Sequence, residues 1–168
     1  MNTTYALNML IKGILKRGDH VLISDMEHNS VFRPIYRLAD EGLIEYDVFS
    51  TEGLRKNASP KVLCEEISRL LRPNTRLLVC THASNICSLM LPLREIGALC
   101  QKNGILFAVD AAQSAGHVNI SMRELGITPD QFEALANVIT RDGALTVGVN
   151  PELKNEDLIR IFQLSDAE

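Results

Sequence analysis

The sequence predicts an α/β fold, in which helices cover both faces of a mostly parallel β-sheet in three layers. Short apolar segments suited to buried strands alternate along the chain with longer segments whose apolar residues recur at the helical period. Gly, Pro or a capping residue marks most of the boundaries. Strands separated by helices pair in parallel, because the chain must cross over between them.

The first part of the chain is expected to begin with a helix that ends before Gly18, where the helical period stops. Pro34 suits the first turn of the second helix, and Gly42 follows the end of that helix. The elements expected here are a helix over 5–16, a strand over 20–24, a helix over 30–41, a strand over 43–49 and a polar loop over 51–58.

The following helix is expected to begin at Pro60, with Ser59 as its N-cap residue. A strand over 76–81, a helix over 93–103 stopped by Gly104 and a strand over 105–109 come next. From about Met122 the regular alternation of predicted strands and helices changes. The remaining predictions are a helix opened by Thr128 and Pro129, a strand over 144–149 and a terminal helix over 155–164.

Composition excludes several classes of protein. The chain has 168 residues, the size of one ordinary domain, with 46% hydrophobic and 23% charged residues. Its net charge of -4 gives no reason to expect nucleic acid or an anionic membrane as a partner. The first apolar stretch, 6–15, is interrupted by Asn8, Lys12 and Gly13, so neither a membrane span nor a signal peptide is expected.

The four cysteines, at 64, 80, 87 and 100, form no CxxC pair. Cys80 falls in a predicted buried strand and Cys100 on the apolar side of a predicted helix, so both are interpreted as core thiols. A disulfide framework is not expected, and cytoplasmic residence is the default.

Asp110 and Gln113 directly follow the predicted strand 105–109. Open α/β sheets bind their ligands at the carboxyl ends of strands. A buried carboxylate facing a heteroaromatic nitrogen would hold that nitrogen protonated, and the amide one helical turn later could bond a ring substituent. The alternative is that Asp110 only caps the next helix.

Three other polar clusters also occupy predicted helix starts or strand exits. Thr3 and Thr4 begin the first helix, where free N–H groups and hydroxyls suit a phosphate, although plain capping is the simpler interpretation. His28 could stack on a flat ring or move protons, or be a surface loop residue. Asn85 offers an amide, or is only a turn residue. Four such clusters at one end of one sheet are hard to explain by capping alone.

A metal site is not expected. The two histidines at strand exits, His28 and His82, have no carboxylate or cysteine partner at a spacing typical of metal ligands.

The chain resembles the class V aminotransferase family of pyridoxal-phosphate enzymes, in particular its cysteine desulfurase-like branch. The resemblance covers residues 1–127, expected to be part of the cofactor-binding large domain. A weaker match over 143–162 resembles the final strand and helix of the family's small C-terminal domain, so residues 128–168 are interpreted as a remnant of it. The matching segments are 2–8, 18–21, 26–31 (Met-Glu-His-Asn-Ser-Val), 72–75, 81–85 (Thr-His-Ala-Ser-Asn) and 104–116.

The resemblance implies that pyridoxal 5'-phosphate is the cofactor, that a cysteine-like amino acid is the substrate and that the chain pairs as a homodimer. It also implies roles for six residues: Thr3 and Thr4 hold the cofactor phosphate, His28 stacks on the pyridine ring and shuttles protons, Asn85 and Gln113 lie at the phenolic oxygen, and Asp110 pairs with the pyridine nitrogen.

The chain departs from the family in four places. It has six lysines, none of which follows a histidine, whereas the family carries a His-Lys pair whose lysine forms a Schiff base with the cofactor. The sulfur-accepting cysteine of the mobile loop has no counterpart, nor has the segment that precedes the phosphate loop. Ser88 and Leu89 stand where relatives carry Gly and Thr.

Two functional hypotheses follow, together with a plain α/β domain that retains no ligand. The first is an enzyme of the cysteine desulfurase type, a lyase or a sulfur transferase, impaired because the lysine and cysteine segments are absent. The second is a non-catalytic remnant that binds a phosphate-bearing ligand or pairs with a full-length relative.

Overall fold

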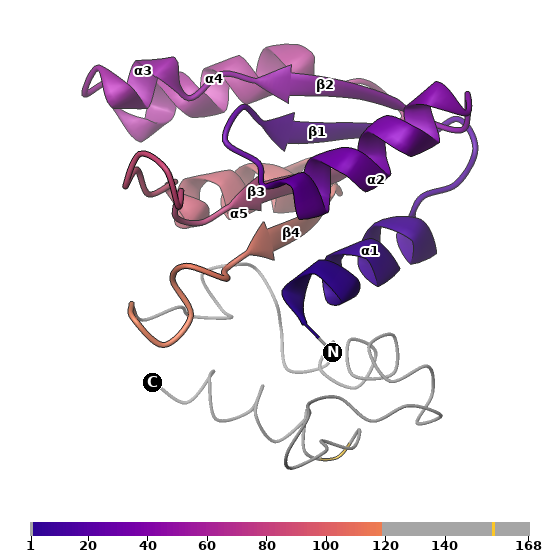
Figure 1. Cartoon of the computed structure of the whole chain (residues 1–168). Coiled ribbons are helices and arrows are strands. Elements are labelled where there is room, and N and C mark those ends of the chain that lie inside the picture. The colour runs from indigo at the N-terminus through magenta and orange to yellow at the C-terminus, as the bar shows by residue number, and fades with distance from the viewer. Residues whose placement is uncertain (1, 119–155, 157–168) are drawn as a thin grey trace.

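The structure, a computed structural model, describes residues 2–118 and Glu156. In this part of the chain, four parallel strands form one sheet in the order β2-β1-β3-β4, with helices on both faces (Figure 1). This confirms the predicted α/β class. The elements are α1 (Thr3–Ile14), β1 (His20–Ser24), α2 (Asn29–Asp40), β2 (Glu45–Phe49), α3 (Glu52–Arg55), α4 (Pro60–Leu70), β3 (Thr75–Thr81), α5 (Leu93–Lys102) and β4 (Leu106–Asp110).

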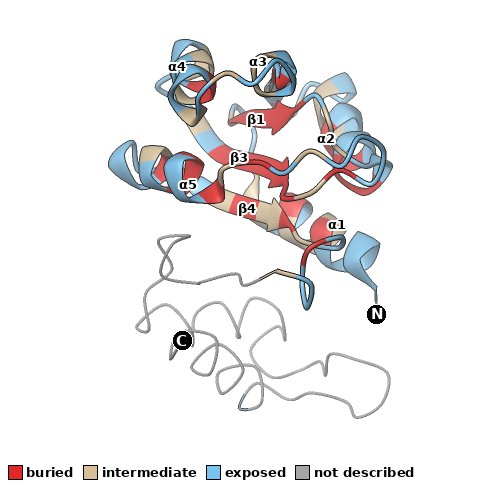
Figure 2. Ribbon diagram, turned by 90° about the vertical axis from the view of Figure 1, so that its left-hand side faces the viewer, coloured by how far each residue is buried: buried red, intermediate tan, exposed pale blue. Residues whose placement is uncertain are grey.

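The two central strands are buried on both faces, because alternate side chains of a strand point to opposite sides of the sheet. In β1, Val21 and Ile23 pack with α1 and α2, whereas Leu22 packs with α4 and α5. In β3, Val79 packs with α1 and α2, whereas Leu78 packs with α4 and α5. Figure 2 shows the buried residues gathered on these strands, between outer helix faces that are exposed. Each fully buried aliphatic side chain contributes roughly 1.5–3 kcal/mol.

The order of the strands creates a switch point between β1 and β3. From β1 the chain crosses to β2 on one side, and from β3 it crosses to β4 on the other. The segments that follow β1 and β3 therefore leave the sheet side by side and then diverge. In open α/β sheets such a switch point forms the crevice in which ligands bind.

Most predicted elements are confirmed with shifts of one or two residues, and β1 and the starts of α4 and α5 fall where expected. The loop predicted over 51–58 is partly wrong, because it contains the short helix α3. The cause is a tertiary contact: Asp25 accepts hydrogen bonds from the backbone N (3.1 Å) and the hydroxyl (2.6 Å) of Thr51, and this fixes the residue before the helix.

Three further predictions differ in detail. The N-cap of α1 is Asn2, whose Oδ1 accepts from the N–H of Tyr5 at 3.0 Å, so the alternative that Thr3 or Thr4 caps this helix is wrong. Ser59 precedes α4 without a side-chain capping bond. Asp110 is the last residue of β4 rather than the residue after it, because it pairs with Thr81 in the ladder.

The predictions beyond residue 118 lie outside the described part of the chain, except for Glu156, which is helical. Among the described helices, none combines the length and the apolar character that a membrane crossing requires. All four cysteines are free thiols, and Cys80 and Cys100 are buried in the core as predicted.

A buried histidine occupies the amino edge of the sheet. His20 is fully buried; its Nδ1 hydrogen-bonds the hydroxyl of Thr75 at 2.8 Å, and its Nε2 lies 3.3 Å from Asp47. Arg72 binds the same Asp47 carboxylate at 2.7 Å. Burial and the nearby Arg72 lower the pKa of His20, and they outweigh the attraction of Asp47. The imidazole is therefore neutral at pH 7.

Acidification should destabilise the fold through His20. A pKa below 6.5 in the folded state means that the unfolded chain binds the proton first, so stability is present above pH 6.5 and is lost as the pH falls. One such group changes the free energy of unfolding by up to about 1.4 kcal/mol per pH unit.

The measurement is urea unfolding of wild type and His20→Asn at pH 7.5, 6.5 and 5.5. Asn keeps a polar group beside Thr75 and removes the titration. Other titrating groups are common to both proteins, so the difference in free energy of unfolding should shrink as the pH falls. Parallel profiles would exclude this role of His20.

Candidate functional site

The carboxyl ends of the strands gather polar side chains at one edge of the sheet. Ser24, Thr81 and Asp110 end β1, β3 and β4, and parallel strands place these ends together. Asp110 lies opposite Thr81 in the register of the β3–β4 pair. The candidate site is therefore centred on the switch point between β1 and β3 and extends to the end of β4.

Asp110 is a buried carboxylate at the end of a strand. Only 5% of the residue is exposed. Its Oδ1 accepts from the N–H of Ala112 at 3.0 Å, and its backbone carbonyl accepts from the N–H of His82 at 2.9 Å. The alternative that Asp110 only caps the next helix is therefore partly right. Its carboxylate does bind a following backbone N–H, but the segment that it caps is a turn and not a helix. The described residues give Oδ2 no hydrogen bond.

Glu27 is a site residue that the sequence analysis did not single out. Its Oε1 accepts from the N–H of Thr81 at 2.8 Å and from the hydroxyl of Ser24, so it joins the segment after β1 to the end of β3. Its Oε2 is buried and has no partner among the described residues. Burial, aided by the charge of Asp110, raises the pKa of Glu27 to about 7 against the hydrogen bonds, which lower it. In the sequence, the feature that could have indicated Glu27 is its position directly before His28.

His28 is an exposed residue at the start of α2. It is the N-cap residue of α2, where its Nδ1 accepts from the N–H of Ser30 at 3.1 Å and lies 2.8 Å from the Ser30 hydroxyl. The residue is nevertheless exposed, so the ring can meet a ligand. Because Nδ1 accepts, the proton of the neutral ring is on Nε2.

His82, which the sequence places at a strand exit, directly follows β3. It is 8% exposed, and its Nδ1 is buried without a partner in the described part of the chain. Burial lowers the pKa of His82. The backbone N–H of His82 donates to the backbone carbonyl of Asp110, and this bond holds His82 beside the end of β4.

Asn85 lies on an exposed turn that follows β3. The hydroxyl of Ser84 supports this turn by accepting from the N–H groups of Ile86 (3.2 Å) and Cys87 (3.3 Å). The Sγ of Cys87 lies 3.7 Å from the Sδ of Met26, so the turn contacts the segment that leads to His28.

Ser88 ends the same turn with a φ of 53°, in the left-handed region that favours glycine. Ser88 stands where the family pattern has Gly, and this backbone conformation explains the glycine of that pattern.

Thr3 and Thr4 reach the same edge from another element. α1 ends shortly before β1 begins, so its first turn lies at the carboxyl ends of the strands, beside the start of α2 (Figure 1). Both threonines are exposed, and because Asn2 caps the helix their hydroxyls are not used for capping. Gln113 is also exposed, in the turn that follows Asp110.

The six predicted residues therefore come from four segments at one edge of the sheet, but within the described chain no hydrogen bond joins any two of them. Their groups suit a ligand that carries a phosphate, an aromatic face and a ring nitrogen: hydroxyls at a helix start, an imidazole, amides and a carboxylate. No three His, Cys, Asp or Glu side chains among the described residues are grouped as they would be around a metal ion.

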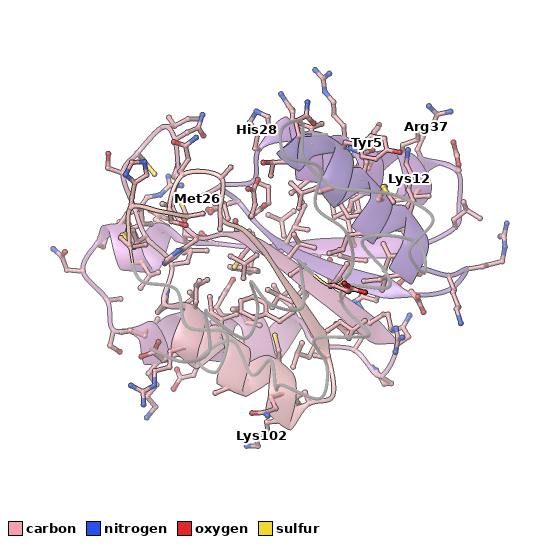
Figure 3. All side chains as sticks on the ribbon, turned by 90° about the horizontal axis from the view of Figure 1, so that it is seen from below. Tyr5, Lys12, Met26, His28, Arg37 and Lys102 are labelled. Atoms are coloured by element: carbon pink, nitrogen blue, oxygen red, sulfur yellow. The ribbon has the colours of Figure 1, made fainter. Side chains whose placement is uncertain are left out.

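The lysines at the ends of α1 and α5 lie away from this edge. Lys12 and Lys102 occupy the last turns of those helices. Viewed from below the sheet, both stand well apart from Met26 and His28 (Figure 3). Lys56 pairs with Glu52 at 2.6 Å.

Comparison with known proteins gives a consistent result. The sequence model of the family described as Aminotransferase class-V matches residues 1–128. A mitochondrial cysteine desulfurase of Eremothecium gossypii is 30% identical over 163 residues, which is 93% of this chain and 32% of the relative. A probable cysteine desulfurase of Methanothermobacter thermautotrophicus is 33% identical over 126 residues, which is 74% of this chain and 30% of the relative.

Among solved structures, a C-DES mutant with glycine covalently linked to its PLP cofactor is similar, with a TM-score of 0.66 and 27% identity. The match covers 75% of this chain and 33% of that one. The chain thus spans about a third of the length of the proteins it matches.

The capping role of His28 can be tested by itself. His28→Ala removes the acceptor of the Ser30 N–H and should lower the free energy of unfolding by about 1 kcal/mol. His28→Asn restores a capping oxygen without the ring and should recover most of that loss. Urea unfolding measures both, with the exposed His117→Ala as control, expected within about 0.5 kcal/mol of wild type. If His28→Ala behaves like the control, the cap contributes nothing.

Proposed function

Because the chain belongs to the aminotransferase class-V family, we propose that it is a cysteine desulfurase-like protein that binds pyridoxal 5'-phosphate at the carboxyl edge of its sheet. The observation that carries the proposal is the carboxylate of Asp110. It is buried at the end of β4, one of its oxygens is engaged by Ala112, and the other is free of hydrogen bonds from the described residues. A carboxylate in that setting suits the protonated nitrogen of a pyridine ring.

The other predicted residues would complete the binding site. Thr3 and Thr4 would bind the phosphate through their hydroxyls and the N–H groups of the first turn of α1. His28 would stack on the ring face. Asn85 and Gln113, both on exposed turns, would reach the phenolic oxygen.

Bound there, the cofactor supplies an electron sink for a carbanion formed from an amino acid. The related structure contains a PLP cofactor, which supports pyridoxal phosphate as the cofactor of this chain. The relatives are named cysteine desulfurases, which supports a cysteine-like substrate. His28 is the residue proposed to be catalytic. Its Nδ1 is occupied by Ser30, so proton exchange would take place at Nε2.

Binding in this 168-residue chain is proposed to be non-covalent, and catalysis to be impaired. None of the six lysines follows a histidine in the family's manner. The positions of Lys12 and Lys102, in the last turns of α1 and α5, support this part of the proposal. The division into a large-domain part over 1–127 and a small-domain part over 128–168 belongs to the same proposal.

A second candidate is a non-catalytic protein that pairs with a full-length relative. The absence of a His-Lys pair favours it, since a complete partner would supply the missing lysine. Pairing with a second copy and a cytoplasmic location remain predictions.

Titration of the purified chain with pyridoxal 5'-phosphate tests the proposed site, with near-visible absorbance and thermal shift as readouts. Asp110→Asn keeps an acceptor for Ala112 but removes the charge, and it should weaken affinity at least about tenfold, because hydrogen bonds to charged groups contribute about 1.5–3 kcal/mol. The matched control is Asp40→Asn, an exposed change at the far end of α2 that should leave affinity unchanged. No spectral change and no thermal shift with wild type would reject cofactor binding.

Borohydride reduction followed by mass spectrometry tests the non-covalent part. No lysine adduct should form on this chain alone. A lysine-specific adduct, together with cysteine-dependent release of sulfide, would show instead that the chain is a complete enzyme.

A further inference from the structure

The side chain of Glu27 joins the segment after β1 to the end of β3. Its Oε1 accepts from the N–H of Thr81 at 2.8 Å and from the hydroxyl of Ser24. These two donors lie on opposite sides of the switch point, and the next residue along the chain is His28. The Glu27 carboxyl therefore connects the two segments that flank the candidate site.

The second oxygen of this carboxyl has an unusual environment. Oε2 is buried and lacks a partner among the described residues. A buried ionised carboxylate oxygen without a donor is far more costly than a neutral O–H in the same place. The Asp110 carboxylate nearby adds repulsion against a second negative charge.

We propose that Glu27 is a positioning residue of the site, which holds the exits of β1 and β3 together and keeps its proton, so that it adds no negative charge beside Asp110. This inference deepens the proposed function and rests on it for the identity of the ligand. A single negative charge suits a ligand that brings one ring nitrogen to Asp110 and a phosphate to α1, because a second buried charge would repel the phosphate.

The groups around Glu27 agree with this assignment. Cys80 of β3 is fully buried, and burial raises the pKa of its thiol well above the usual value, so this residue brings no charge beside Glu27. Burial lowers the pKa of His82, so its imidazole supplies no positive charge at pH 7. On its own segment, Glu27 is flanked by His28 and by Asp25, which is engaged with Thr51. The pKa of Glu27 itself, about 7, is high enough for the proton to be retained below neutral pH.

Two backbone amides report the two carboxyls separately. The N–H of Thr81 donates to Glu27, and the N–H of Ala112 donates to Asp110. In a proton–nitrogen correlation spectrum of the full chain without ligand, the Thr81 amide should shift with a midpoint near pH 7. A Thr81 amide that titrates near pH 4.5, the usual value for Glu, would overturn the proposal.

Glu27→Gln supplies an independent readout through stability. A carboxyl whose folded pKa is raised makes wild type less stable as the pH rises from about 4.5 to about 7, because the unfolded chain loses the proton first. The urea midpoint of wild type should therefore fall relative to that of Glu27→Gln over this range. The control Glu65→Gln, on the exposed face of α4, should follow wild type. Equal slopes for wild type and Glu27→Gln would overturn the proposal.

Addition of pyridoxal 5'-phosphate separates the two proposals. Glu27→Gln should retain wild-type affinity at pH 6, whereas Glu27→Ala, which leaves the Thr81 N–H without its acceptor, should lose at least about tenfold in affinity. If the Thr81 amide titrates near pH 7 but neither it nor the Ala112 amide responds to the cofactor, the proposed function fails while the protonated Glu27 stands. If the cofactor binds and Glu27→Ala binds it as well as wild type, the positioning role fails.

Discussion

The parallel pairing of β1 with β3 is the constraint on which the rest of the molecule depends. These two strands carry apolar side chains on both faces, so their burial requires a layer of helices on each side, and α1, α2, α4 and α5 supply it. The chain leaves the pair in opposite directions, toward β2 and toward β4. An apolar core therefore holds the polar segments that follow β1 and β3 beside each other.

The candidate site has an energetic cost that the core offsets. Glu27 Oε2 and His82 Nδ1 are buried without partners among the described residues, and groups left in this state cost about 1–3 kcal/mol each. Ser88 adds the strain of a left-handed backbone. Each fully buried residue of the two central strands, such as Ile23 or Leu78, stabilises the fold by a free energy of similar size. The burial of the sheet therefore offsets the cost of the unpaired polar atoms. Strain and unpaired polar groups concentrated at strand exits are typical of functional sites.

Family membership and chemistry have to be kept apart for this chain. The match to the aminotransferase class-V family covers residues 1–128, and the chain spans about a third of the length of the cysteine desulfurases that it resembles. In the proposed function, the chain contributes the edge of the sheet that would bind a phosphate, a ring and a ring nitrogen. The lysine that gives the family its covalent chemistry has no counterpart at the positions where the motif would place it.

By itself the sequence determined the order and type of most elements, because helical and strand periodicity are local and Gly18, Pro60 and Gly104 mark their limits. It also pointed to His28 and Asp110, since polar residues at strand exits are visible without coordinates. Only the tertiary structure decided that Glu27 bonds to Thr81, more than fifty residues away, and that Asp25 orders α3. Such contacts depend on strand order, which no local pattern encodes, and the pKa of Glu27 follows from burial that exists only after the strands have assembled.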